Sequence, residues 1–190
     1  MTSDRPPLDV IVDDLMAGPV RVTDIRARVP SAPGLYTWWA RPAVLPHLVG
    51  PRHPDQQDLR LLYVGLATKL RSRLVSNHLR RSGSSTLRRT LAGLLLDEQG
   101  YRTHRTDRAV LVQEDAARLT AWMDSHLQVS WREHPTPRDD EGHVIRALRP
   151  PLNVDHAAGP ALAIIKAARR HYYDSAGPRP QLRHPTPASS

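Results

Sequence analysis

Two tyrosines in short apolar segments could do chemistry together. Tyr36 lies in residues 33–39, which read PGLYTWW, and Tyr63 lies in residues 61–65, which read LLYVG. Both segments are typical of strands, and alternation along the second would place Leu61, Tyr63 and Gly65 on one face. If the strands pair as a hairpin, both phenols can reach one face of the sheet. A strand tyrosine taken alone is more often a packing residue at the edge of a core.

A basic helix is predicted directly after the second tyrosine segment, over residues 69–81. Its apolar stripe consists of Leu70, Leu74 and His78. Arg73 borders this stripe, where a guanidinium held against the sheet could clamp a phosphate. Asn77 follows one turn later on the same edge. The alternative is an ordinary solvated arginine, since Arg71 and others lie nearby.

A carboxylate interrupts the apolar face of another predicted helix, over residues 141–148. Glu141 shares that face with Val144, Ile145 and Leu148. An inward carboxylate costs free energy unless something compensates it, and a divalent cation is one compensator. The alternative is that Glu141 only favours the helix N-terminus, behind Asp139 or Asp140 as the cap. Both interpretations stay open on the residues alone.

Two further polar segments could support a site. Asn153 follows two prolines, which would stiffen the helix exit and direct this amide toward the sheet; otherwise it is a turn residue. Residues 84–89, which read SSTLRR, place hydroxyls at a predicted helix N-terminus ahead of Arg88 and Arg89. Such a segment can hold a phosphate or serve as a plain cap with solvated arginines.

The strands and helices predicted around these residues indicate an α+β fold with a small central antiparallel β-sheet of about three strands, flanked by helices. The third strand candidate covers residues 129–131, and a further helix is predicted near residues 115–127. The predicted organisation is a helical extension over 1–30, a main domain over 31–155 with an inserted loop at 41–58, a basic C-terminal helix at 156–176 and a disordered tail at 177–190.

Composition narrows the classes of function. Lys and Arg outnumber Asp and Glu by 27 to 19, which gives a formal net charge of +8 and favours a polyanionic partner. The chain has no cysteine, which excludes disulfides, thiolate catalysis and cysteine-based zinc sites. No long apolar run is present, and the N-terminus is unlike a signal peptide, so we expect a cytoplasmic protein without a membrane partner.

Taken in order, the pieces resemble the GIY-YIG nuclease superfamily over about residues 33–155. Gly34-Leu35-Tyr36 is similar to the first motif of that family, and Tyr63-Val64-Gly65 is similar to the second. Arg73, Glu141 and Asn153 match its helix arginine, its metal-binding glutamate and its terminal asparagine. The sequence departs from the family in the long 41–58 insertion between the motifs and in Leu66, where many members have a basic residue.

The resemblance implies hydrolysis of phosphodiester bonds in nucleic acid, with DNA favoured over RNA, by a metal-dependent endonuclease. Glu141 would hold Mg²⁺ or Mn²⁺. Tyr36 would act as the general base or orient the attacking water, Tyr63 would lie beside the phosphate, and Arg73 would neutralise its charge. His78 would relay a proton, and Asn153 would hold the geometry of the site.

One glycine and five basic or polar residues near these motifs would contact the nucleic acid. They are Gly65, Lys69, Arg71, Asn77, Arg88 and Arg89. Whether Asn77 or its neighbour His78 faces the site stays open at this point. The alternative function is a non-catalytic nucleic-acid-binding protein that retains only the fold.

Overall fold

The computed structural model describes residues 6–48, 50–79, 85–154 and 160–178. Its central sheet is antiparallel, in the order β1-β6-β2-β3. These strands are β1 (Val20–Arg21), β6 (Leu127–Glu133), β2 (Gly34–Ala40) and β3 (Arg60–Ala67). The predicted α+β class and antiparallel sheet are confirmed, but about three strands were predicted. The two-residue strand β1 adds a fourth, because Val20 and Arg21 pair with β6.

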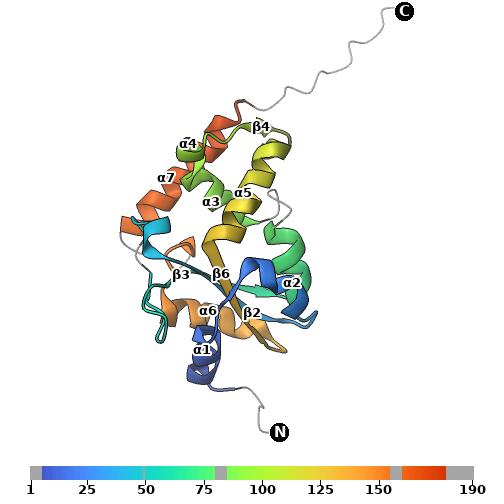
Figure 1. The fold of residues 1–190 in the computed structure, drawn as a ribbon, viewed down its shortest axis with the longest axis vertical. Coiled ribbons are helices and arrows are strands. Elements are labelled where there is room, and N and C mark those ends of the chain that lie inside the picture. Colours follow the sequence, from blue (N-terminus) through green and yellow to red (C-terminus); the bar gives the residue numbers. More distant parts are fainter. Residues whose placement is uncertain (1–5, 49, 80–84, 155–159, 179–190) are drawn as a thin grey trace, which may run out of the picture.

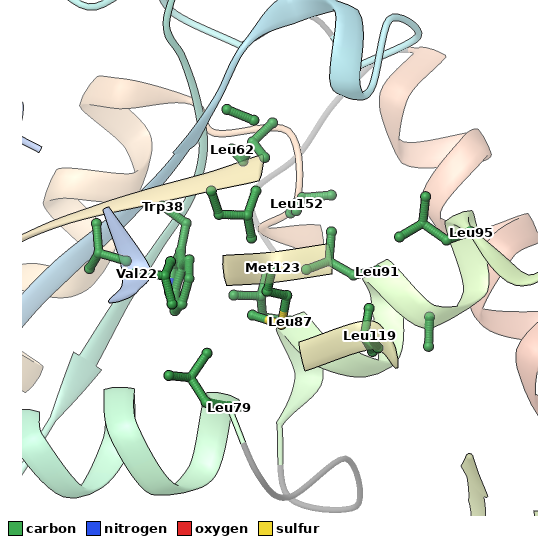
Figure 2. Close-up of a cluster of buried hydrophobic side chains, with 14 of the residues drawn as sticks. Val22, Trp38, Leu62, Leu79, Leu87, Leu91, Leu95, Leu119, Met123 and Leu152 are labelled. Atoms are coloured by element: carbon green, nitrogen blue, oxygen red, sulfur yellow. The ribbon is translucent and has the colours of Figure 1, made fainter. Parts of the chain in front are cut away.

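Buried side chains form two cores, one on each face of the sheet. One core joins Leu35 and Trp39 of the sheet to α1 (Leu8–Met16) and α6 (Pro137–Leu148). The other joins Trp38 to α3 (Thr86–Leu94) and α5 (Gln113–His126). Figure 2 shows this second cluster, where Trp38, Leu87 and Met123 lie close together. Alternation along β2 therefore sends neighbouring tryptophans into different cores.

A β-bulge changes which residues of β3 share a face. Trp38 pairs with Tyr63 and Trp39 pairs with Leu61, so Leu62 is the extra residue. Leu61 consequently packs in the core of α1 and α6, whereas Leu62 packs in the opposite core. The prediction that Leu61 shares a face with Tyr63 and Gly65 is wrong, because the bulge interrupts the alternation between Leu61 and Tyr63.

Helix α6 begins four residues earlier than predicted, at Pro137. Proline suits this first helical position because its missing N–H would be unpaired there. The acidic residues of the first turn are Asp139 and Asp140, so Glu141 follows in the next turn. The interaction of a carboxylate with the helix dipole falls off beyond the first turn, so Glu141 gains less from it than Asp139 and Asp140 do.

The N-terminal segment is part of the packed domain. Ile11 and Leu15 of α1 are fully buried, and the carbonyl of Leu15 accepts a hydrogen bond from Ser130 on β6. After β1 the chain forms η1 (Val22–Asp24) and α2 (Ile25–Arg28), whose Val22 and Ile25 enter the larger core. Residues 8–28 thus contribute to the sheet and to both cores.

The inserted segment between the tyrosine strands contains a short 3₁₀ turn, η2 (Pro42–Val44). It returns to the sheet through a bridge between Arg52 and Arg60. His53 is buried there, and its Nδ1 accepts hydrogen bonds from the backbone N–H groups of Asp55 and Gln56. The insertion is therefore anchored to the start of β3.

The C-terminal half adds a layer at one end of the molecule. After α3 come α4 (Leu96–Gln99) and a hairpin of β4 (Thr103–Arg105) and β5 (Ala109–Leu111) that was not predicted. Helix α7 (Pro160–Ser175) packs along α3, as Figure 1 shows. A Cβ at Gly93 would collide with the carbonyl of Ala168, so this glycine permits the close approach.

Part of the predicted C-terminal helix and most of the predicted tail, residues 179–190, lie outside the described residues. Within the described ranges, no helix combines the length and the apolar composition that crossing a membrane requires.

Candidate active site

The β2–β3 hairpin brings the two tyrosines together. Tyr36 of β2 pairs with Gly65 of β3, and Tyr63 of β3 pairs with Trp38, two residues after Tyr36. Both phenol rings therefore lie on the same face of the sheet, with their centroids 6.3 Å apart. Gly65 is buried beneath Tyr36, and a Cβ there would come 2.5 Å from the Tyr36 hydroxyl oxygen. Gly65 thus makes room for the phenol, and its contact with nucleic acid stays a prediction.

Tyr36 is fully buried, and its hydroxyl has two side-chain partners. Nε of Arg73 donates to the hydroxyl oxygen at 3.1 Å, and Nε2 of His78 lies 2.7 Å from it. Burial raises the pKa of Tyr36 far above its ordinary value; nearby Tyr63 raises this pKa further, and Arg73 opposes the shift. The phenol is therefore protonated at neutral pH; it accepts from Arg73 and lies within hydrogen-bond distance of Nε2 of His78.

His78 is a neutral imidazole. It is fully buried, and its pKa is lowered well below 6.5, first by burial and then by the charges of Arg73 and Arg88. A neutral ring can accept the Tyr36 proton at Nε2 while its Nδ1 lies 2.7 Å from the hydroxyl of Ser85. His78 thus lies behind Tyr36, on the side away from the open cavity.

A π-helical segment aims both partners at Tyr36. The helix after β3 is π-helical over Ser72–His78, labelled η3. Arg73 and His78 are five residues apart, which in an α-helix would separate their directions by about 140°. In a π-helix, residues i and i+5 are joined by one hydrogen-bonded turn and lie on one face. The wider turn therefore lets both side chains reach the same hydroxyl.

Arg88 supports this segment from below. It is 1% exposed, and its guanidinium donates to the carbonyls of His78 and Leu79 at 3.3 and 3.2 Å and to the carbonyl of Ala116. Its backbone N–H also donates to Ser85, the residue that caps α3. The prediction that Arg88 contacts nucleic acid is wrong, since its charge is directed at carbonyls inside the protein.

An open cavity of about 510 Å³ lies above the tyrosines. Side chains from β2, β3, the turn after β3, η3 and α6 line it, including Tyr36, Tyr63, Lys69, Arg73, Asn77, Arg138 and Glu141. Glu141 is close enough to raise the pKa of both tyrosines, although burial is the larger cause in each case. Carboxylate, guanidinium and phenols from distant parts of the chain thus meet around one space.

The other residues that were predicted to contact nucleic acid lie at different places relative to the main cavity. Asn77 faces the cavity and His78 lies behind Tyr36, so both reach the site from different sides. Arg71 lies away from this cavity, and its guanidinium donates to the carbonyl of Val29 at 3.3 Å. Arg89 lines a different cavity beside α7.

Arg138 was missed by the sequence reasoning. It lines the main cavity one turn before Glu141 on α6. If the helix had been predicted to begin at Pro137, Arg138 and Glu141 would have been recognised as neighbours on one helix face, three residues apart.

Asn153 holds the edge of the sheet. Its side chain accepts from the N–H of Val64 at 2.9 Å and donates to the carbonyl of Val64 at 2.8 Å. Strand β3 is an edge strand, and these two bonds satisfy the backbone between Tyr63 and Gly65 as a neighbouring strand would. Asn153 therefore fixes the register of the residues that present Tyr63.

The residues present fit a magnesium-like ion. Among the described residues no cluster of three His, Cys, Asp or Glu side chains could enclose a metal. Glu141, however, lines the main cavity and also a smaller one that extends from it. Mg²⁺ is commonly held by one or two carboxylates together with waters and substrate phosphate oxygens.

A family model described as the GIY-YIG catalytic domain matches residues 34–171. Since this match covers most of the chain, the protein belongs to the GIY-YIG family, and the resemblance seen in the sequence is confirmed. No curated protein and no solved structure matches the chain. Membership of this family indicates nuclease-type activity on nucleic acid.

Proposed function

We propose that the protein is a metal-dependent endonuclease that hydrolyses phosphodiester bonds, with DNA as the favoured substrate. The observation that carries this proposal is the single cavity lined by Tyr36, Tyr63, Arg73 and Glu141. Two phenols, a guanidinium and a carboxylate could surround one phosphate there, and polar groups aimed at developing charge stabilise a transition state strongly.

Glu141 would hold Mg²⁺ or Mn²⁺ at this cavity. Such an ion, when bound, polarises the phosphate and stabilises the leaving oxygen. Arg73 would neutralise charge on the phosphorus from the opposite helix. Burial lowers the pKa of Arg73, but its contacts with Tyr36 and Tyr63 raise this pKa overall, so its charge is secure.

Tyr36 and His78 would move the proton of the attacking water. As the water oxygen attacks phosphorus, its proton passes to the Tyr36 oxygen, and the Tyr36 proton passes to Nε2 of His78 at 2.7 Å. This relay replaces a free phenolate, which the raised pKa of Tyr36 makes costly, by an imidazolium on His78, which the lowered pKa of that ring makes short-lived. Tyr63 would contact the phosphate, while Lys69, Asn77 and Arg138 would hold the flanking backbone.

Cleavage of plasmid and linear DNA tests the proposal. The purified protein with Mg²⁺ or Mn²⁺ should nick or cut DNA, and EDTA should stop the reaction because Glu141 then has no ion to hold. The assay should be accompanied by a gel shift at two salt concentrations. Salt-sensitive binding without any cleavage would instead support the non-catalytic nucleic-acid-binding protein.

A further inference from the structure

A second polar hollow extends the main cavity toward α7. It has a volume of about 170 Å³ and shares Tyr63 and Glu141 with the main cavity. Arg169 of α7 and Thr86 of α3 form its far wall. Both of these residues also line a third cavity, of about 300 Å³, between α3, α7 and the β4–β5 hairpin. The three hollows therefore lie in a row, each sharing wall residues with the next, from the candidate catalytic residues to α7.

The third cavity has the charge that a phosphate backbone requires. Arg89, Arg108 and Arg169 line it, together with a single acidic residue, Asp107. Arginine pairs well with phosphate oxygens because its planar guanidinium presents several donors in a fixed geometry. The basic charge comes from three separate elements, α3, the hairpin and α7, which converge at this end of the groove.

The third cavity also has an aromatic wall. Tyr172 is buried, while the neighbouring Tyr173 is 46% exposed although its ring is large and apolar. The guanidinium of Arg105 lies over the Tyr173 ring, 3.9 Å from its centroid. This contact holds the ring in place, because Arg105 also donates to the carbonyl of Tyr173. Arg105 covers one face of this ring, so the opposite face is the one on which an unpaired base could stack.

We propose that the third cavity binds an unpaired nucleotide of the same strand whose phosphate lies at the candidate catalytic residues. A base inside a duplex is stacked and paired, so it can enter such a cavity only by leaving the helix, which costs free energy. The protein accordingly acts on nucleic acid with a single-stranded segment beside the scissile phosphate. This inference rests on the proposed nuclease function, and it adds the form of the substrate.

Binding of labelled oligonucleotides tests the cavity separately from cleavage. The Glu141→Gln variant in Mg²⁺ should bind a duplex with a short single-stranded overhang at least about fivefold more tightly than a blunt duplex, in line with base stacking on aromatic side chains. Adding Tyr173→Ala should abolish this preference, whereas Tyr173→Phe keeps the ring and should retain it. Quenching of 2-aminopurine in the overhang should follow the same order.

Arg108→Ala should also weaken binding of the overhang. Its matched control is Arg21→Ala, since both arginines are exposed and pair with a nearby aspartate, but Arg21 lies on β1 at the opposite edge of the sheet from β3. Thermal unfolding of each variant separates loss of binding from loss of fold. Equal affinity for blunt and overhanging duplexes, or a preference that survives Tyr173→Ala, would overturn the inference. Absence of cleavage by the wild type would contradict the nuclease function instead.

Discussion

Gly65 shows how closely the tyrosines are packed at the scale of single residues. A Cβ at this position would lie 2.5 Å from the Tyr36 hydroxyl oxygen and 2.8 Å from a ring carbon of Tyr63. Gly65→Ala should therefore displace both phenols, lower any cleavage rate at least about tenfold, and destabilise the fold by about 1–3 kcal/mol through overpacking.

Gly142→Ala is the matched control for that substitution. This glycine lies inside α6, and a Cβ there meets only the Arg146 guanidinium at an ordinary 3.5 Å. Alanine favours a helix interior by about 1 kcal/mol over glycine, so stability should rise slightly and cleavage should persist. Urea denaturation and a cleavage assay check the pair, and equal behaviour of the two variants would contradict the packing described here.

His78 should make stability depend on pH. In the folded protein its pKa lies well below 6.5 because of burial and the charges of Arg73 and Arg88, whereas the unfolded chain titrates near 6.5. The unfolded state thus takes up a proton first, and the free energy of unfolding should fall as the pH drops below about 6.5. Denaturation of wild type and His78→Gln between pH 7.5 and 5 should show a smaller decline in the variant.

The π-helix η3 is the element that makes the site. Its wide turn brings the side chains of Arg73 and His78 to the Tyr36 hydroxyl. Arg88 of α3 donates hydrogen bonds to the carbonyls of His78 and Leu79, near the end of this segment. A π-helical turn is rare and is found often at functional sites. We expect the stability of this segment to depend on contacts beneath it, rather than on the surface residues that face the cavity.

Arg88→Met tests this dependence. Removing the buried guanidinium removes its hydrogen bonds to the carbonyls of His78, Leu79 and Ala116. The Thr120 hydroxyl also donates to Leu79 and Ala116 and replaces only part of these bonds, so the variant should be destabilised by about 1–3 kcal/mol. The neighbouring Arg89→Met removes a partly exposed side chain and should change stability by less than about 1 kcal/mol. Chemical denaturation measures both, and a stable Arg88→Met protein would contradict the supporting role.

At the scale of the whole molecule, the sheet brings together residues from distant parts of the chain. Tyr36, Tyr63 and Arg73 were predictable because short local patterns place them on two strands and the following helix. The resemblance to the family implied that Glu141 would lie near these three residues. The structure gives the physical reason, because α6 packs against the sheet and carries Glu141 to the same cavity. Local pattern and family resemblance together therefore anticipated most of the cavity.

Other features could not be predicted, for identifiable reasons. The bulge at Leu62 cannot be recognised from the pattern of apolar residues in β3, because it is defined by the pairing with β2. Arg88 looked like a surface charge because burial of an arginine depends on carbonyls supplied by distant elements. Arg138 was overlooked because the helix was predicted to begin only at Glu141, although proline at position 137 begins a helix well.

The most direct measurement is single-turnover DNA cleavage by wild type, Glu141→Gln and Arg73→Ala in Mg²⁺ or Mn²⁺, with circular dichroism to confirm folding. If carboxylate and guanidinium act on one phosphorus, each variant should cut at least about a hundredfold more slowly while remaining folded. Folded variants that cut as fast as the wild type would show that the cavity between β3, η3 and α6 is not where the bond breaks.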